Sequence, residues 1–346
     1  MENAAPDGLS GLYTSGLGNL NANKVKEAEE DFKKILATDK KSPMGLTGLA
    51  LVDLNKKRFR RSLGHVDKAL HYNGDFVDAL VTRGRVIVER EKKDWRQDAL
   101  DTYDAALKLD PDNQAAHYYQ GECYLKAYDF TEAARSFDSA SKLQGSLQET
   151  AGARSLLVEK ILKAGPLTES GKAIALTATI DRASLCALLI EELNLRKLVK
   201  THRNKLFAEL FHDDFKLRHH IKKVPPDISS HPNRHQIFPV AMLEVPDLTV
   251  FPDGRFYPGK KVSRAQYAVI IHGICGLLEN DHGNTLASGV TVSSDVHADY
   301  YAYEAIMCCM RKNLLQVNGK SLFRPAEAVS GVDAVLAVCA LRDEFK

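Results

Sequence analysis

Small and aromatic residues recur along the first 140 residues at a nearly constant spacing. Three positions repeat with steps of 34, 37 and 34 residues, as Ala28, Phe32 and Ile35, then Ser62, Val66 and Ala69, then Ala99, Tyr103 and Ala106, then Ala133, Phe137 and Ala140. A second column repeats with steps of 34, 34 and 37 residues, at Gly16, Ala50, Gly84 and Gly121. Three extra residues therefore fall between Gly84 and Ala99, and we expect them in an inter-helix turn at about 91–96. Such a period predicts stacked helix pairs that bury a continuous core together.

Four helix pairs are predicted, at about 9–37, 43–72, 77–109 and 113–143. Pro111 and the glycines at 74 and 145 stand at the ends of pairs. Proline removes an amide donor and glycine permits positive φ, so both stop helices there. Segment 148–164 is a further amphipathic helix, which we expect to cover the exposed apolar face of the last pair.

The 34-residue period, with small residues where two helices cross and an aromatic residue four positions later, resembles the tetratricopeptide repeat, or TPR. The resemblance implies an all-α TPR superhelix of about four helix pairs over residues 1–147. It also implies that the first helix of each pair lines a groove for a protein or peptide partner. On this sequence the implied groove residues are Tyr13, Thr47, Arg85, Tyr118 and Glu122. The Lys/Asn pattern by which chaperone-binding TPR domains clamp a terminal carboxylate is not visible.

The second half of the chain repeats a different pattern. A turn with the sequence Phe-Pro-Asp-Gly-Arg-Phe-Tyr-Pro, residues 251–258, precedes a capped helix that starts after Ser263. A further copy matches it at Asp295, Val296, Phe323, Pro325 and Ser330, and a weaker copy matches at Ile180, Asp181, Arg182 and Ala183. These residues resemble the S-layer homology, or SLH, motif. The resemblance implies a pseudo-threefold helical domain with short loop or strand segments over 148–346, with copies at about 150–194, 225–279 and 293–346.

The residues that open these helices have a capping chemistry. Asp181, Ser263 and Ser330 each directly precede an apolar helical pattern, so their side-chain oxygens can accept hydrogen bonds from first-turn amides. Ser263 followed by Gln266 is also a capping box. Capping does not explain why arginine follows the cap at 182 and 264, where a third copy has Gly331.

An arginine beside a helix N-terminus makes a site for a carboxylate or phosphate. SLH domains grip anionic cell-wall carbohydrate through the arginine at this place of the motif. The resemblance therefore implies an anionic glycan site formed by Arg182, Ser263, Arg264, Gln266 and Asp253. Because only two copies have the arginine, sites that have lost their ligand are an open alternative.

A basic insertion at 195–224 separates the first two copies. Between 196 and 223 it holds nine Lys and Arg against three acidic residues, alternating with apolar residues. This pattern indicates an amphipathic helix or two, with a solvated face, a glycan surface, a membrane interface or a partner surface all open. Histidines gather nearby at 212, 219, 220, 231 and 235, but their spacing matches no usual zinc pattern. We predict no metal and no cofactor.

Composition excludes several classes of protein. The chain of 346 residues is 44% apolar and 27% charged with a formal charge of +2, which is ordinary for a soluble protein with no global basic field. No run of 18 apolar residues predicts a transmembrane helix, and the start has no basic-then-apolar export signal. The six cysteines lie in apolar patterns, which favours buried thiols over disulfides or a metal cluster. No nucleic-acid motif and no catalytic fingerprint is present, so we predict no enzyme.

These patterns leave three functional hypotheses. The leading one is a non-catalytic adaptor of the bacterial cell envelope or periplasm. Its TPR groove would bind a protein partner, and its SLH-like half would bind wall polysaccharide or peptidoglycan. The alternative is an intracellular scaffold in the cytoplasm whose SLH-like half is structural, which the missing export signal favours. An uncharacterised metal-dependent enzyme is the third, supported only by the histidines.

Overall fold

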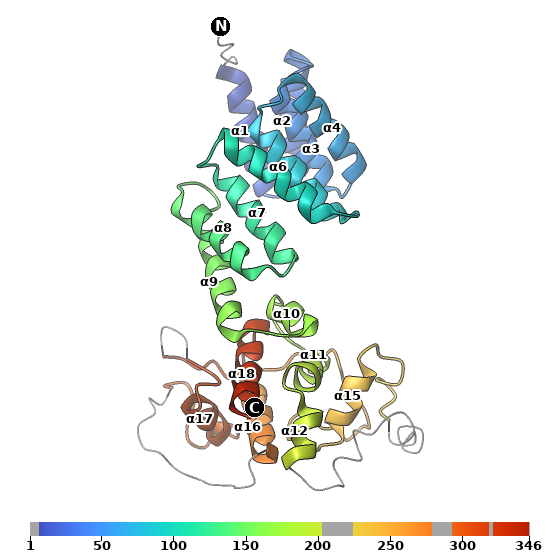
Figure 1. Ribbon diagram of the computed structural model, residues 1–346, viewed down its shortest axis with the longest axis vertical. Coiled ribbons are helices and arrows are strands. Elements are labelled where there is room, and N and C mark those ends of the chain that lie inside the picture. Colours follow the sequence, from blue (N-terminus) through green and yellow to red (C-terminus); the bar gives the residue numbers. More distant parts are fainter. Residues whose placement is uncertain (1–6, 203–223, 279–292, 318–320, 346) are drawn as a thin grey trace. The chain divides into compact units, whose positions relative to one another are not determined.

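The computed structural model describes residues 7–202, 224–278, 293–317 and 321–345 (Figure 1). The chain divides into two compact units, Met1–Glu159 and Lys160–Lys346. The division lies inside one helix, α9 (Gln148–Ala164), whereas the sequence placed the boundary just before that helix. In the described ranges the elements are helices, with isolated β-bridges instead of strands. The all-α fold class predicted from the sequence is confirmed.

Four helix pairs form the first unit, as the 34-residue period predicts. They are α1 (Asp7–Asn21) with α2 (Val25–Thr38), α3 (Pro43–Asn55) with α4 (Phe59–Tyr72), α5 (Val77–Arg90) with α6 (Trp95–Leu109), and α7 (Gln114–Lys126) with α8 (Phe130–Lys142). The extra residues lie in the turn between α5 and α6, as expected. Two residues of that turn, Glu91 and Asp94, have positive φ of 46° and 61°.

The small residues of the repeat allow an aromatic ring to enter the helix crossing in the first, third and fourth pairs, and Val66 takes this place in the second. A Cβ added at Gly84 would lie 2.5 Å from the ring of Tyr103, and one added at Gly121 would lie 2.8 Å from the ring of Phe137. Both rings are fully buried. A larger side chain at either glycine would push the helices apart, because a packed core leaves no room for it. The spacing seen in the sequence is therefore the spacing of these ring contacts.

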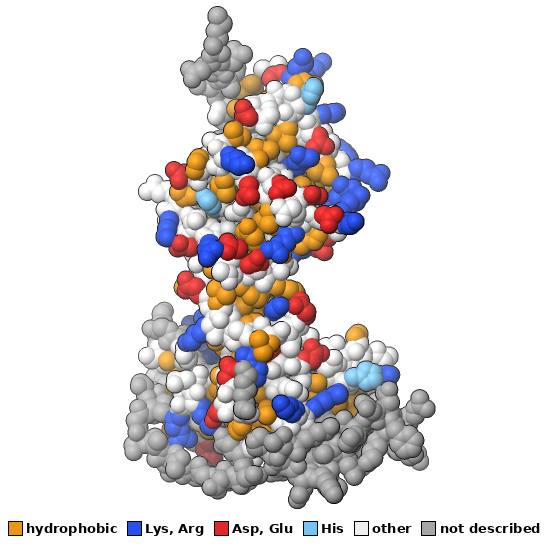
Figure 2. Space-filling model, in the orientation of Figure 1, with side chains coloured by type: hydrophobic (Ala, Val, Ile, Leu, Met, Phe, Trp, Pro, Cys, Tyr) orange, Lys and Arg blue, Asp and Glu red, His pale blue; other side chains and the backbone are white. Residues whose placement is uncertain are grey.

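The helix α9 covers the end of the array. Ala151 and Val158 are fully buried, and Arg154 Nε lies 2.8 Å from a carboxylate oxygen of Glu122 on α7. The covering helix predicted at 148–164 is therefore present. Figure 2 shows that positive and negative side chains are interspersed over much of the visible face of this first unit.

The second unit contains shorter helices. They are α10 (Glu169–Ala175), α11 (Arg182–Ala187), the π-helical turn η1 (Leu188–Glu192), α12 (Leu195–His202), α15 (Arg234–Ala241), α16 (Arg264–Leu278), α17 (Tyr303–Arg311) and α18 (Gly331–Glu344). The helices α11, α16 and α18 are those that follow the three predicted caps. The start of the basic insertion forms α12, and residues 203–223 of it lie outside the described residues.

A closed ring of backbone hydrogen bonds joins the three copies of the second unit. The amide of Ile180 donates to Val329 O at 3.2 Å, that of Val329 to Val262 O at 3.0 Å, and that of Val262 to Ile180 O at 3.2 Å. All three residues are at most 2% exposed, and each directly precedes the cap of its helix. Equivalent residues bonded head to tail in a ring give the unit the pseudo-threefold arrangement that the sequence predicted.

Two further sequence predictions concern the membrane and the cysteines. In the described ranges, none of the helices combines the length and the hydropathy needed to cross a bilayer. All six cysteines are thiols; five are buried and Cys308 is half-buried. Burial raises the pKa of the Cys123 thiol to about 11. Buried, protonated thiols of this kind pack as small apolar groups.

Candidate functional site

Three of the five expected groove residues are buried in the array. The hydroxyl of Tyr13 donates to Asp78 Oδ2 at 2.9 Å, and its ring packs against Phe32. Thr47 is 0% exposed, and Tyr118 is also buried. We expected these side chains on the concave side because they lie on first helices. First helices such as α3, however, pack both on the second helix of their own pair and on helices of neighbouring pairs. The burial of Tyr13, Thr47 and Tyr118 therefore argues against a role for these side chains as partner contacts.

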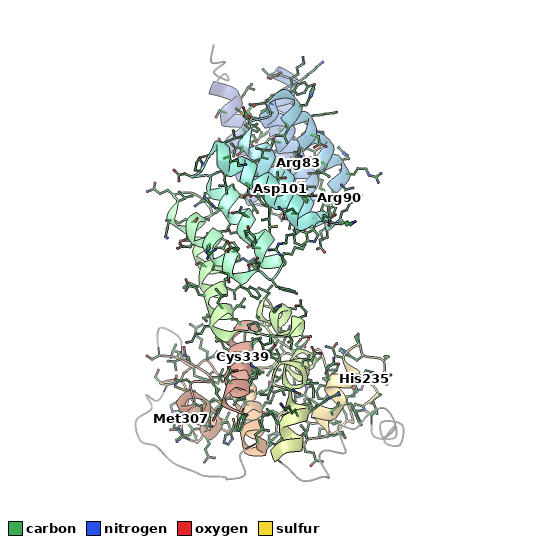
Figure 3. All side chains as sticks on the ribbon, in the orientation of Figure 1. Arg83, Arg90, Asp101, His235, Met307 and Cys339 are labelled. Carbon is green, nitrogen blue, oxygen red and sulfur yellow. The ribbon has the colours of Figure 1, made fainter. Side chains whose placement is uncertain are left out.

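The other two expected groove residues are accessible. Arg85 lies on α5, the helix that carries the labelled Arg83 and Arg90 in Figure 3. Its guanidinium stacks on the ring of Tyr119, 4.1 Å from the ring centroid. Glu122 is half-buried and pairs with Arg154, and burial raises the pKa of its carboxyl. Their role as partner contacts stays a prediction.

In the second unit the predicted caps are present. Asp181, Ser263 and Ser330 each accept a hydrogen bond from the amide three residues later, at 2.8, 3.2 and 3.2 Å. Gln266 completes the predicted capping box by accepting from the Ser263 amide at 3.2 Å. The side chains of Ser263 and Gln266, expected to contact a ligand, are thus engaged in holding the start of α16.

Arg182 is buried under the loop of the second copy. Its Nε, Nη1 and Nη2 atoms donate to the carbonyls of Phe256, Asp247 and Thr249 at 2.8, 2.5 and 2.6 Å. The guanidinium also lies 4.3 Å from the ring centroid of Phe256, and the residue is 4% exposed. Burial lowers the pKa of this guanidinium. These contacts argue against the ligand contact expected from the sequence, and they make Arg182 a residue that positions the loop.

Replacing Arg182 by lysine should show this positioning role. A single ammonium cannot reach three separated carbonyls, so we expect the free energy of unfolding of the second unit to fall by about 2 kcal/mol. Hydrogen exchange of the peptides covering 245–258 measures this loss. The matched change Arg255→Lys, at an exposed position of the same loop, should leave exchange unchanged. Equal protection in the two variants would contradict the positioning role.

Arg264 makes the corresponding contacts with the third copy but stays at a surface. Its Nε donates to Phe323 O at 2.7 Å and its Nη2 to Gln316 O at 2.6 Å. Its Nη1 lies 3.8 Å from Asp333 Oδ2, and the side chain is 12% exposed. Burial lowers the pKa of this guanidinium, while Asp333 acts in the opposite direction.

A cavity of about 830 Å³ lies beside Arg264, lined by the last turn of α9, the loop of the third copy and α18. Its charged lining consists of four cations and three anions, which are Lys160, Lys163, Arg264, Arg324, Glu327, Asp333 and Asp343. Asp333 pairs with both Lys160, at 3.4 Å, and Arg264. Of the five residues expected to bind glycan, Arg264 is the one that lines this cavity. Asp253 lies instead in an exposed turn, where it accepts from the Arg255 amide.

The sequence patterns did not lead us to expect Lys160, Lys163 and Arg324 at a site. Arg324 lies between Phe323 and Pro325, both of which were recognised as motif residues. Lys160 and Lys163 lie three residues apart on α9, a spacing that puts two side chains on one helix face. The signals were therefore present, but nothing in the sequence placed α9 beside the loop of the third copy.

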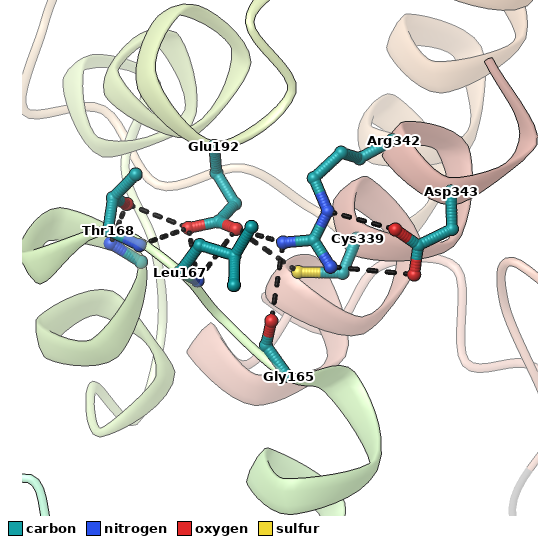
Figure 4. A network of polar contacts seen from close by, with 8 residues as sticks. Gly165, Leu167, Thr168, Glu192, Cys339, Arg342 and Asp343 are labelled. Carbon is teal, nitrogen blue, oxygen red and sulfur yellow. Dashed lines mark hydrogen bonds and ion pairs between the residues drawn. The ribbon is translucent and has the colours of Figure 1, made fainter. Parts of the chain in front are cut away.

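A buried ion pair joins the first copy to α18 (Figure 4). Glu192 accepts hydrogen bonds from the amides of Leu167 and Thr168, both at 2.9 Å, and from the Thr168 hydroxyl at 2.7 Å. Its carboxylate also pairs with Arg342, which donates to Gly165 O at 3.2 Å. The carboxylate of Glu192 and the guanidinium of Arg342 thus both bond to groups of the protein itself, so this network is suited to stabilising the second unit.

The described histidines do not form a metal site. His231 Nδ1 accepts a hydrogen bond from the Asn233 amide at 3.1 Å, and His235 Nε2 lies 3.2 Å from Arg234 Nε. In the ranges that the structure describes, no three His, Cys, Asp or Glu side chains are grouped so as to hold a metal ion. The histidines at 212, 219 and 220 lie outside those ranges.

Comparisons with known proteins support the TPR resemblance of the first half and the SLH resemblance of the second. A family model of the tetratricopeptide repeat matches residues 96–146, and one of the S-layer homology domain matches residues 248–268. No curated protein matches the chain.

Similar solved structures include the thermophilic TPR protein TTC0263 of Thermus thermophilus, with 16% identity, 55% of this chain and 95% of that chain covered, and a TM-score of 0.40. They also include YrrB, described as a TPR protein with an unusual peptide-binding site, with 19% identity, coverage of 44% and 75%, and a TM-score of 0.32. MamA from Desulfovibrio magneticus matches with 17% identity, coverage of 46% and 98%, and a TM-score of 0.32. By the two family models, the chain carries a tetratricopeptide repeat in its first half and an S-layer homology motif in its second.

Proposed function

We propose that this protein is a non-catalytic adaptor of the bacterial cell envelope. Its TPR array binds a protein or peptide partner, and its second unit binds an anionic polymer of the cell wall. The TPR and SLH matches support a role in protein interaction or envelope binding. Arg85 and Glu122 are the accessible groove residues that would contact the protein partner.

The observation that carries the wall-binding part is the cavity beside Arg264. It is concave, it is lined by Lys160, Lys163, Arg264 and Arg324, and it includes the arginine of the SLH motif. Ammonium and guanidinium groups that converge on one hollow suit carboxylate or phosphate groups of a polymer. The three acids of the lining offset part of this charge, so hydrogen-bond geometry has to contribute to binding as well.

An intracellular scaffold whose second unit is structural is the alternative function. The geometry of Arg182 favours it, because the arginine of the first copy is saturated by loop carbonyls and does not reach the solvent. This alternative differs from the adaptor in one measurable respect, namely whether the full chain is retained on wall polymer.

Removing cavity cations tests the proposal. We expect the full chain to be retained on purified peptidoglycan with its attached wall polymer, and Lys163→Gln with Arg324→Gln to weaken retention roughly tenfold, because two ionic contacts of moderate strength are lost. Both residues are exposed, so we expect the fold to stay intact.

The matched control is Arg255→Gln with Lys261→Gln, which removes the same charge at exposed positions outside the cavity. It should bind like the unmodified chain. If both variants lost retention equally, net charge alone and not the cavity would determine binding to the wall polymer. A chain that is not retained at all would favour the intracellular scaffold.

A further inference from the structure

A strongly basic hollow lies on the TPR array, separate from the expected groove residues. It has a volume of about 450 Å³ and is lined by six cations and one aromatic residue, with no acidic residue among them: Lys57, Arg58, Phe59, Arg60, Arg61, Arg90 and Lys92. These residues come from the turn between α3 and α4, the first turn of α4, the end of α5 and the turn after it. Figure 2 shows Lys and Arg side chains gathered on this side of the first unit, near the Arg90 labelled in Figure 3.

Little of this charge is neutralised within the protein. Asp53 pairs with Arg58 at 3.9 Å and with Arg61 at 3.4 Å, but it is buried beneath them. The neighbouring Glu91 pairs with Lys126 instead. Within the described ranges, we find no ion pair of Lys57, Arg60 or Lys92. An anion that enters the hollow would therefore meet at least these three cations without displacing an ion pair of theirs within the described residues.

The placement of these cations is unfavourable for the helix that carries them. The positive end of the helix dipole lies at the N-terminus of α4, where acidic residues stabilise a helix and basic ones destabilise it. The first turn of α4 nevertheless contains Arg60 and Arg61 and no acidic residue. Like charges at short separation add to this cost. The ion pairs with Asp53 account for Arg58 and Arg61. A fold-stabilising role does not explain the other cations of the cluster, whereas a negatively charged partner would relieve both effects.

We propose that this hollow, formed by residues 57–61, Arg90 and Lys92, docks an acidic segment of a protein partner. Guanidinium groups match carboxylates with paired hydrogen bonds, and the half-buried ring of Phe59 offers an apolar floor for the aliphatic parts of Asp and Glu side chains. The hollow is confined to two turns and the helix ends beside them, so it offers a short peptide a site but gives a nucleic-acid backbone no extended track.

This docking surface differs from the proposed groove. Neither Arg85 nor Glu122 lines the hollow. It is also independent of wall binding, because every residue that lines it belongs to the first unit. The two proposals can therefore fail separately.

Binding of a fluorescent peptide of alternating Glu and Gly residues to the full chain tests the proposal. We expect saturable binding in fluorescence anisotropy that weakens as salt is added, since the contact is ionic. The variant Lys57→Gln, Arg60→Gln, Lys92→Gln should raise Kd roughly tenfold, because three unpaired cations are lost from the hollow.

The control variant Lys33→Gln, Arg135→Gln, Lys142→Gln removes the same charge from exposed sites on α2 and α8 and should leave Kd unchanged. Phosphatidylglycerol vesicles and single-stranded DNA are tested in parallel. The proposal is overturned if the peptide does not bind, if both triple variants weaken it equally, or if vesicles or DNA bind through the hollow in place of the peptide. Circular dichroism checks that both variants remain folded.

Discussion

Replacing Glu192 by alanine is expected to lower the free energy of unfolding of the second unit by about 3–5 kcal/mol. The carboxylate is 0% exposed and is the shared acceptor for Arg342 and for the amides of Leu167 and Thr168. Its removal would leave Arg342, whose side chain is 10% exposed, without that buried counter-charge. Breaking one side of a buried ion pair costs more than the pair contributes, because the remaining charge stays desolvated.

The loss of unfolding free energy in Glu192→Ala should depend on pH, because the Glu192 carboxyl titrates. Burial alone would raise the pKa of Glu192, but the hydrogen bonds from Leu167 and Thr168 and the charge of Arg342 outweigh it and lower the pKa below the ordinary 4.5. A group with a lowered folded pKa stabilises the fold fully above its unfolded pKa, and this contribution is lost as the pH falls through the folded pKa. The difference between the unmodified chain and Glu192→Ala should therefore narrow as the pH falls below 4.5.

Hydrogen exchange of peptides from α10 and α18 reports this effect for the second unit alone. That resolution is needed because two units need not unfold together. Glu169→Ala is the control, since it removes the same charge from a side chain that is 76% exposed. We expect the control to change stability by no more than about 0.5 kcal/mol. A Glu192→Ala variant as protected as the control would show that the network does not hold the unit.

The TPR half could be predicted from the sequence because its order is local. Gly84 and Tyr103 lie in one helix pair, so a fixed spacing encodes their contact. The groove was less predictable. A spacing identifies the first helix of a pair, but the burial of Thr47 depends on how neighbouring pairs stack around α3.

The second half shows the same limit more sharply. The caps at Asp181, Ser263 and Ser330 were predictable, because a cap and its amide are three residues apart. The acceptors of Arg182 lie more than 60 residues away in sequence, and Glu192 pairs with Arg342 across 150 residues. The motif places an arginine beside a helix N-terminus and so predicts an anion site. It does not show that distant loop carbonyls already accept the hydrogen bonds of that arginine.

The third copy differs from the others at Gly331, and the structure gives a physical reason for it. Arg182 and Arg264 each reach into the long loop of the following copy. In cyclic order the copy that follows Gly331 is the first one, where a short turn stands in place of that loop. The Gly331 amide donates to Thr177 O at 3.0 Å, as the amides of Arg182 and Arg264 donate to Lys260 O and Glu327 O, but here backbone oxygens also occupy the place of a side chain. An arginine at position 331 would find no long loop whose carbonyls accept its hydrogen bonds, and its Cβ would clash with the backbone oxygen of Ile174.

Gly331→Ala should therefore lower the free energy of unfolding of the second unit by about 3 kcal/mol, at the upper end of the usual cost of overpacking. The added Cβ would lie 1.9 Å from Ile174 O and 2.8 Å from Thr177 O, which are backbone atoms that cannot rotate away. Hydrogen exchange of α10 and α18 measures the loss. Gly259→Ala, where a Cβ meets nothing within 4 Å, is the control.

Gly331→Arg distinguishes the two interpretations of the third copy. If Gly331 marks a glycan site that has lost its arginine, restoring the arginine should be tolerated and should strengthen retention on wall polymer. If the glycine is required by the close approach of Ile174 O and Thr177 O, the same change should destabilise the unit at least as much as alanine does, because arginine has the same clashing Cβ and further atoms to place. We expect the second result, since arginine occurs in this fold where a long loop accepts its hydrogen bonds and glycine stands where that loop is missing.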